Sequence, residues 1–136
     1  MKYWLIKSEP STWSWEDQAR EKITMWDGVR NYQARNNLIK MKNGDLCFFY
    51  HSVKEKSIVG IVEVIKESYP DPTDKTNKFV VVDVKIKEKL KNKVTLDQIK
   101  VEKTLSHLAL IKQSRLSVMS IDILSWKKII KLSKKK

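Results

Sequence analysis

The segment from Trp26 to Asn36 holds the side chains of this sequence that are best suited to binding a flat, polar ligand. Its sequence, WDGVRNYQARN, combines a tryptophan, a tyrosine, two arginines, asparagines and a glutamine around one glycine. Aromatic rings stack on heterocycles, carboxamides hydrogen-bond to ring edges, and guanidinium groups bind phosphate. The segment is too polar for a core and too aromatic for an ordinary surface loop. It predicts the wall of a pocket for a nucleobase.

Three residues of this segment could contact such a ligand directly. Trp26 precedes Gly28, which tolerates unusual turn conformations, so we expect its ring to be free in a loop; a place in the core is the alternative. Asn31 offers a donor and an acceptor to a base edge, or it serves only as a helix cap. Arg30 could stack on the ring or bind phosphate, or form a structural ion pair.

Polar residues at the ends of predicted strands could reach the same site. Tyr50 and Ser52 end an aromatic-rich strand and share one of its faces, whereas His51 lies on the other face. We predict that all three contact the ligand, with a purely structural role as the alternative for His51. Ser8, at the end of the first predicted strand, could line the same mouth.

A stiff segment, Tyr69-Pro70-Asp71-Pro72, could form the lip of the pocket, because two prolines fix its backbone φ angles. Tyr69 would then supply a second aromatic ring, and Asp71 would accept a hydrogen bond from an exocyclic amine. Pro70 would hold these two residues in place. A simple turn without a ligand is the alternative.

The positive charge of the chain is concentrated in its second half. The formal net charge is +12; residues 1–69 hold 11 basic and 9 acidic groups, whereas residues 70–136 hold 17 and 7. A basic surface attracts polyanions without reading their sequence. We assign phosphate contacts to Lys7, Arg35 and Arg115, with a structural role as the alternative for Arg35. A lysine-rich composition with solvated faces would explain the same charge.

The elements that must position these residues follow from the spacing of apolar residues, caps and turns. Ser14 with Asp17 predicts a capping box, Asn31 and Asp122 predict further helix caps, and Asn43-Gly44-Asp45 predicts a turn. The predicted helices cover 15–21, 32–41, 96–101, 105–112 and the segment after Asp122, and the predicted strands cover 3–7, 46–51, 58–65, 79–86 and 115–119. This order indicates an α+β fold around a small, strongly curved sheet.

Composition excludes several classes of protein. With 136 residues, 41% of them hydrophobic, we expect a single domain with a real core. One cysteine and two histidines leave no disulfide framework and little for metal chemistry, so we predict no metal and no cofactor. No apolar run has the length of a signal peptide or a membrane span. We therefore expect a cytoplasmic, soluble protein without a membrane partner, and a monomer.

Six blocks of the sequence, in this order, resemble the EVE domain family. They are YWLIKSEP (3–10), WDGVRNYQARN (26–36), GDLCFFYHS (44–52), IVGIVEV (58–64), YPDPT (69–73) and SRLSV (114–118). The resemblance implies a PUA-like pseudo-barrel of five to six strands with surrounding short helices, in a single domain over 1–133 followed by a basic tail, 134–136. It also implies that Leu116 and Ser117 of the last block lie at the ligand site, with a packing role as the alternative for Leu116.

The resemblance further implies a function. EVE domains are similar to YTH domains, which hold a methylated adenine in an aromatic cage, and they are thought to read modified bases in DNA or RNA without catalysis. The sequence has no nucleophile elbow, no metal-spaced cluster and no phosphate-binding glycine loop, so we predict that it is not an enzyme. A sensor of a free nucleobase or nucleotide, and an interaction module with a vestigial pocket, are the alternatives.

Overall fold

The computed structural model describes residues 1–135, and its elements alternate between strands and short helices. The strands are β1 (Tyr3–Ser8), β2 (Ile23–Met25), β3 (Leu46–His51), β4 (Ser57–Pro70), β5 (Val80–Thr95) and β6 (Val118–Ile121). The helices are α1 (Trp15–Glu21), α2 (Tyr32–Lys40), α3 (Leu96–Lys100), α4 (Ala109–Lys112) and α5 (Ile123–Ser133), with a 3-10 turn at Lys103–Leu105.

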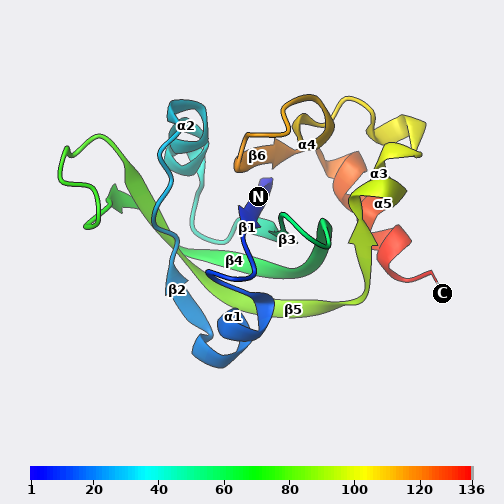
Figure 1. Cartoon of the computed structure of the whole chain (residues 1–136), viewed down its shortest axis with the longest axis horizontal. Helices are drawn as coiled ribbons and strands as arrows, with labels where there is room; N and C mark the ends of the chain where they lie inside the picture. The colour runs from blue at the N-terminus through cyan, green and yellow to red at the C-terminus, as the bar shows by residue number, and fades with distance from the viewer. Residues whose placement is uncertain (136) are drawn as a thin grey trace.

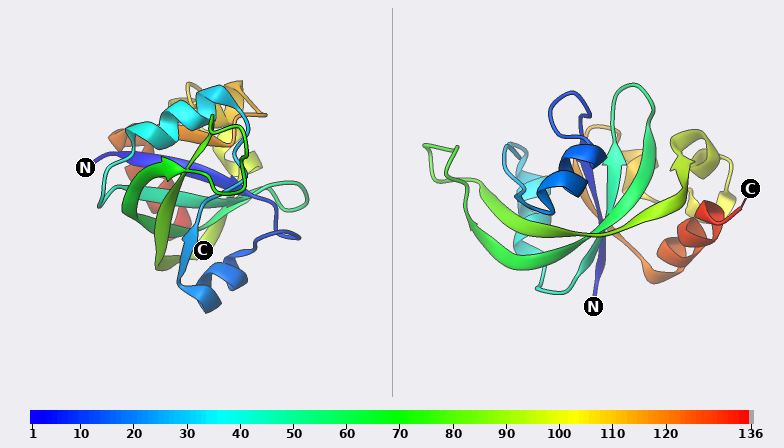
Figure 2. Two further views of the ribbon diagram at one scale, coloured as in Figure 1. Left: turned by 90° about the vertical axis from the view of Figure 1, so that its left-hand side faces the viewer. Right: turned by 90° about the horizontal axis from the view of Figure 1, so that it is seen from below.

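The six strands form one mixed sheet in the order β2-β5-β4-β3-β1-β6. Strands β1 and β3 pair in parallel, and the other neighbours are antiparallel. Register shifts interrupt the pairing of β4 with β5 at several points, and such bulges bend and twist a sheet. Figures 1 and 2 show the consequence, a curled sheet in which β4 and β5 arch across the molecule. The predicted α+β fold with a strongly curved sheet is confirmed.

Local capping signals place the helices as the sequence predicts. The hydroxyl of Ser14 accepts from the amide of Asp17 while the Asp17 carboxylate accepts from the amide of Ser14, so the capping box at α1 is confirmed. The side chain of Asn31 accepts from the amide of Ala34 at 2.9 Å and starts α2. Asp122 caps α5 in the same way through Ser125.

Aromatic residues from distant parts of the chain fix the helices on the sheet. Trp126 of α5 stacks on Phe48 of β3 with ring centroids 3.7 Å apart. Trp15 of α1 packs edge-on against Phe49 and lies over Gly60 of β4. A methyl group on Gly60 would come within 2.3 Å of the Trp15 ring. The glycine is therefore required for the approach of α1 to the sheet.

Several predicted boundaries are wrong, and tertiary pairing explains each difference. β4 continues to Pro70 and β5 to Thr95 because the two strands pair along their whole length, so Tyr69 and Pro70 end a strand instead of forming a loop. The short strand β2 lacks an apolar pattern of its own and exists through its pairing with β5. The helix predicted over 105–112 is split into a 3-10 turn and α4, and β6 begins at Val118 instead of Arg115.

The buried core spans residues from Trp4 to Leu132, and the domain bounds of 1–133 stay a prediction. The side chain of Asn92 donates to the carbonyls of Ser133 and Lys135, so the first part of the predicted tail follows α5 closely; Lys136 lies outside the described residues. Within residues 1–135, no helix has the length and apolar character needed to cross a membrane, and no three His, Cys, Asp or Glu side chains cluster as metal ligands.

Candidate functional site

A cavity of about 680 Å³ opens where β1, the segment after β2 and the residue before β6 come together. Its walls are formed by Lys7–Glu9, Thr12 and Trp13, by the segment Thr24–Arg30 and by Ser117. Two tryptophans, Trp13 and Trp26, belong to this lining, and we call it the indole cavity. Its volume falls in the range of about 300–1,000 Å³ that is usual for small-molecule sites.

The sequence left two alternatives for Trp26, a free ring in a loop or a place in the core, and the structure shows features of both. Its backbone amide donates to the carbonyl of Val82 at 2.8 Å, which extends the edge of the sheet beyond β2. Its ring packs edge-on against Phe49, with centroids 5.6 Å apart and planes at 83°, and only 7% of the residue is exposed. One side of the indole therefore belongs to the core while the residue also lines the cavity. A ring held in this way is preorganised for stacking.

Trp13 is an aromatic lining residue that the sequence analysis did not select. It is half-buried, and its indole N–H donates to the side chain of Gln18 at 3.0 Å. The hydroxyl of Ser8 donates to the carbonyl of Trp13 and so folds the loop after β1 back on itself. A tryptophan in a polar Ser-Thr-Trp-Ser context just after a strand was the available signal.

The segment that carries Trp26 is anchored by a buried carboxylate. Asp71 accepts from the amide of Gly28 and from the Arg30 guanidinium, both at 3.0 Å, and from the amide and hydroxyl of Thr73 at 2.7 and 2.6 Å. Burial opposes ionisation of Asp71, but these hydrogen bonds hold its pKa below the usual value. With its acceptor sites occupied, Asp71 positions the cavity wall and does not line the cavity.

Arg30 lies at the edge of the cavity with its orientation fixed. Besides Asp71, its guanidinium donates to the hydroxyl of Thr73 at 3.0 Å and lies over the ring of Phe79, 5.5 Å from the centroid. Its side chain is still 41% exposed. The ion pair proposed as the alternative role therefore exists, and the remaining guanidinium surface faces outward.

Lys7 supplies a second cation to the lining of the cavity. Its ammonium group donates to the carbonyl of Ser114 at 2.8 Å and lies 5.7 Å from the ring centroid of Tyr50. Burial, together with the charge of Lys56, lowers the pKa of Lys7. Lys56 belongs to a cleft of about 300 Å³ whose other basic residues are Lys54, Lys93 and Lys100. The same cleft is also lined by Asp97 and by Glu55, which pairs with Lys93 at 2.8 Å and offsets part of this charge.

Four predicted site residues, Tyr50, His51, Ser52 and Tyr69, do not line the cavity. The imidazole of His51 accepts from the amide of Trp15 at 3.0 Å, and burial lowers its pKa. Tyr50 is buried, which raises its pKa to about 12. The Ser52 hydroxyl donates to the carbonyl of Ser8 at 3.3 Å. The Tyr69 hydroxyl donates to Asp83, and Lys66 lies over its ring. The rings of Tyr50 and Tyr69 therefore do not converge with Trp26.

The remaining predicted residues are divided between the cavity and its surroundings. Ser8 and Ser117 line the indole cavity, as predicted. Asn31, Arg115 and Leu116 line a neighbouring hollow instead. Arg35 lies over the ring of Tyr32 and donates to the carbonyl of Lys78 at 3.1 Å, while Pro70 ends β4 beside Val80.

The curled six-stranded sheet with an aromatic cavity at one end defines a small α+β domain of the PUA-like type. The chain belongs to the EVE domain family, whose model matches residues 2–132. The family assignment made from the sequence blocks is confirmed. Thymocyte nuclear protein 1 of Gallus gallus is 37% identical over 153 residues, covering 88% of this chain and 63% of the relative. The Mus musculus protein of the same name is 42% identical over 124 residues, covering 72% and 55%. The chain spans about 55–63% of the length of these two curated vertebrate relatives.

Solved structures share the whole fold. A protein of Rhodopseudomonas palustris superposes with a TM-score of 0.92 at 47% identity, covering 98% of this chain and 93% of the other. Human THYN1 protein, in complex with 5-methylcytosine containing DNA, superposes with a TM-score of 0.93 at 32% identity, covering 100% and 99%. A Zygosaccharomyces rouxii YTH domain, at 16% identity, a TM-score of 0.61 and 98% and 87% coverage, shows the likeness of the fold alone.

Proposed function

We propose that this protein is a non-catalytic nucleic-acid-binding domain that holds a methylated base, taken out of its stack, in the indole cavity. The observation that carries this proposal is the cavity itself, whose lining includes two tryptophans, Trp13 and Trp26, and two cations, Lys7 and Arg30. The relative in complex with 5-methylcytosine containing DNA has the same fold over the whole chain, which supports a nucleic-acid ligand.

The energetics of such a site require more than one contribution. Taking a base out of a duplex costs a few kcal/mol, and stacking on an aromatic ring contributes about 1–3 kcal/mol for each base. A buried methyl group adds about 0.8 kcal/mol, so it distinguishes a modified base only several-fold by itself. The remaining affinity must come from phosphate contacts, and we assign these to Lys7, Arg30 and the lysines of the cleft around Lys56.

The edge of the base could be read by side chains that the sequence analysis did not select. Asp27 and Glu9 line the indole cavity, and both are exposed. A carboxylate accepts a hydrogen bond from the exocyclic amine of cytosine, the role predicted for Asp71. We assign that role to Asp27, since the Asp71 carboxylate is occupied by Gly28, Arg30 and Thr73.

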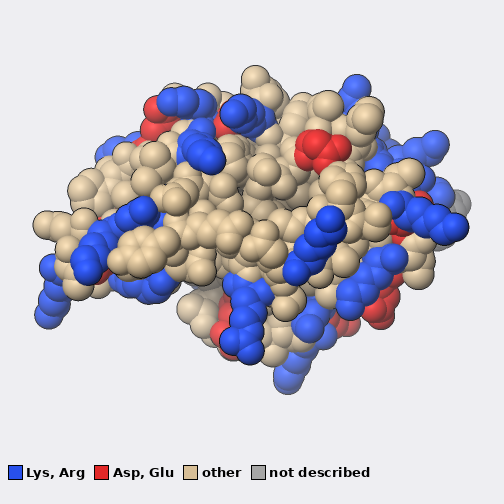
Figure 3. Space-filling view, turned by 90° about the horizontal axis from the view of Figure 1, so that it is seen from above, with Lys and Arg blue, Asp and Glu red and all other residues tan. Residues whose placement is uncertain are grey.

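Charge on the molecular surface fits a polyanionic partner. Figure 3 shows Lys and Arg side chains around much of the edge of the face that carries α2 and α4, with few acidic groups between them. Two groups that could perform acid–base chemistry near the cavity, His51 and Asp71, are occupied by hydrogen bonds that hold the fold. This arrangement supports binding in place of catalysis. Cytoplasmic location and a monomeric state stay predictions.

The test is the affinity for a single-stranded oligonucleotide with one 5-methylcytosine, compared with its unmodified form at two salt concentrations. Trp26→Leu keeps apolar volume beside Phe49 but removes the flat ring, and we expect it to weaken binding about 5–150-fold, the equivalent of one stacking contact. Tyr69→Phe is the matched control, because it alters an aromatic residue outside the cavity.

Three results decide between the candidates. Wild-type affinity that falls steeply with salt, a preference for the methylated strand and a loss only in Trp26→Leu support the proposal. Tight binding of the free nucleoside with little dependence on salt favours the small-molecule sensor instead. Equal affinity of wild type and folded Trp26→Leu for the methylated strand refutes the role of the indole cavity.

A further inference from the structure

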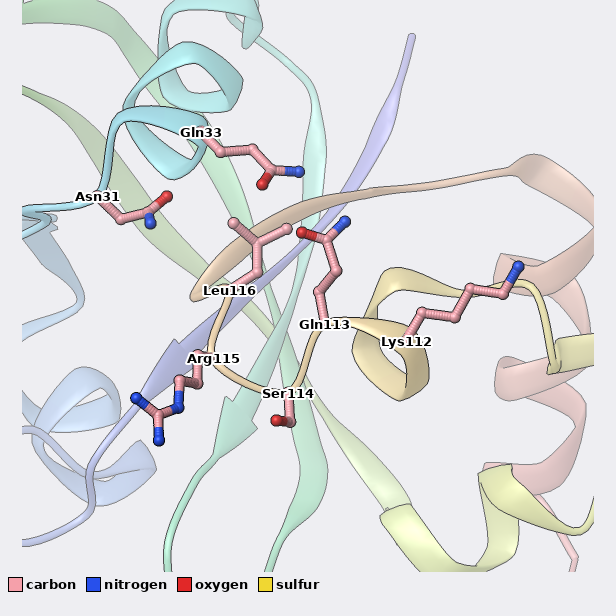
Figure 4. A pocket seen from close by; sticks show the side chains of 7 residues that line it. All are labelled: Asn31, Gln33, Lys112, Gln113, Ser114, Arg115 and Leu116. Carbon is pink, nitrogen blue, oxygen red and sulfur yellow. The ribbon is translucent and has the colours of Figure 1, made fainter.

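A second hollow, of about 320 Å³, lies directly beside the indole cavity. Its walls are Asn31 and Gln33 at the start of α2 and the segment Lys112–Leu116 before β6, and we call it the carboxamide hollow. Figure 4 shows the amide groups of Gln33 and Gln113 pointing toward each other above Leu116, while Lys112 and Arg115 extend away on opposite sides.

The carboxamides of this hollow have hydrogen-bonding capacity left over. The Asn31 carbonyl oxygen accepts from the amide of Ala34, which orients the side chain so that its NH₂ group remains to donate elsewhere. The side chains of Gln33 and Gln113 form no hydrogen bond with any residue in the part of the chain that is described. Three carboxamides at one hollow present several donors and acceptors to a single ligand.

The two walls are held at a fixed separation. The Gln113 carbonyl accepts from the amide of Leu116 at 3.0 Å, which closes a turn over the buried Leu116 side chain. The Lys7 ammonium holds this turn through the carbonyl of Ser114, and the Asn37 side chain of α2 donates to the carbonyl of Val118 at 2.7 Å. A site supported in this way does not need to order its walls when it binds a ligand.

The chemistry of the hollow suits a nucleotide edge and phosphate. Its lining includes the cations Lys112 and Arg115, and none of the residues that form it is acidic or aromatic. It could therefore hydrogen-bond a base edge and attract a phosphate, but it could not provide a stacking surface. That makes it a poor primary site for a modified base and a suitable site for a neighbouring one.

The carboxamide hollow adjoins the indole cavity closely enough to receive the next nucleotide of the same nucleic-acid strand. Arg30 and Ser117 line the cavity, while their immediate chain neighbours Asn31 and Leu116 line the hollow. Consecutive Cα atoms are about 3.8 Å apart, so the two sites meet along both walls. Lys7, which lines the cavity, contacts the turn that forms the hollow.

We propose that the carboxamide hollow binds the nucleotide adjacent to the modified base on the same strand, with Gln33 and Gln113 on the base edge and Arg115 near its phosphate. This inference rests on the proposed function of the indole cavity. Carboxamides pair with the neighbouring donor and acceptor of adenine, so adenine is the flanking base that we expect to be favoured.

The experiment uses single-stranded oligonucleotides with one 5-methylcytosine, flanked on each side in turn by adenine or by an abasic residue. For wild type, we expect the abasic replacement on one side to weaken binding about 5–150-fold. In Gln33→Ala/Gln113→Ala this difference disappears, because the groups that contact the flanking base are gone. Asn43→Ala, an exposed carboxamide that lines neither site, is the matched control and keeps the difference.

A second readout separates this inference from the proposed function. Titration with 5-methyl-2′-deoxycytidine, followed by the indole N–H resonances of Trp13 and Trp26, reports on the cavity alone and stays unchanged in the double variant. If the double variant keeps the full adenine-over-abasic difference, the hollow is not the flanking site, although methyl preference and sensitivity to Trp26→Leu would still support the cavity. If wild type shows neither methyl preference nor a shift of these resonances, the proposed function fails and this inference falls with it.

Discussion

Asp71→Asn is the substitution that tests most directly how the indole cavity is held in shape. The aspartate side chain is fully buried and accepts four hydrogen bonds, two on each oxygen. An asparagine of the same size can accept on one side only, so either the Thr73 pair or the Gly28 and Arg30 pair loses its partner. Since Thr73 is local, we expect its two bonds to be kept and Gly28 and Arg30 to be released.

The magnitude follows from these two lost bonds. A hydrogen bond to a charged group contributes about 1.5–3 kcal/mol, but a guanidinium as exposed as that of Arg30 finds water instead, which limits its share to about 1 kcal/mol or less. The expected loss in the free energy of unfolding is therefore about 1.5–4 kcal/mol. For a domain of this size that corresponds to a fall in Tm of roughly 5–16 °C.

Asp74→Asn provides the matched control, because Asp74 repeats the same local arrangement three residues later. It accepts from the amide and hydroxyl of Thr76 and from the amides of Lys78 and Phe79, and it makes no contact with the cavity wall. We expect both variants to lose thermal stability, measured by circular dichroism. Only Asp71→Asn should also lose affinity for the methylated oligonucleotide, measured at a temperature where both are folded.

One outcome would refute this reasoning. If Asp71→Asn melts earlier but binds the methylated strand as tightly as Asp74→Asn, the Gly28–Arg30 segment keeps its shape without the carboxylate. Asp71 would then stabilise the fold without positioning the site.

Two further predictions concern stability. Gly60→Ala places a methyl group within 2.3 Å of the Trp15 ring, so we expect a loss of about 1–3 kcal/mol in the free energy of unfolding, measured by urea denaturation; an unchanged midpoint would contradict the required close approach. The depressed pKa of Asp71 stabilises the fold above the pKa of a free carboxyl, about 3.9, and this contribution is lost as pH falls through the lower folded-state pKa. Tm should accordingly stay level from pH 7 to 5 and fall below about pH 4. In Asp71→Asn, this fall of Tm at acid pH should be smaller.

The sequence alone was sufficient to predict those structural features whose cause lies within a few residues of the chain. The capping box of Ser14 and Asp17 and the cap at Asn31 each depend on a side chain reaching an amide three residues away. The strand 46–51 was predicted with its observed bounds, because a run of aromatic and apolar residues ends at a turn signal on one side. These local signals, together with the six family blocks, determined the α+β class and the family.

The candidate site depended on contacts between residues far apart in the chain. Asp71 and Arg30 are 41 positions apart, so neither residue type by itself distinguishes a ligand contact from an anchor. Tyr69 was expected at a lip because two prolines follow in close succession, but pairing with β5 keeps it in β4 and directs its hydroxyl to Asp83. Trp13 lines the cavity because the hydrogen bond from the Ser8 hydroxyl to its carbonyl holds the loop after β1 in place.

The residue types of this chain therefore predicted a pocket with Trp26 in its wall, and Trp26 does line the indole cavity. Only the tertiary structure decided that Trp13 is its partner, and that Asn31 and Leu116 face a separate hollow. Hydrogen bonds within a helix turn are fixed by chain geometry, whereas the meeting of β1, the segment after β2 and the turn before β6 depends on the packing of the whole sheet.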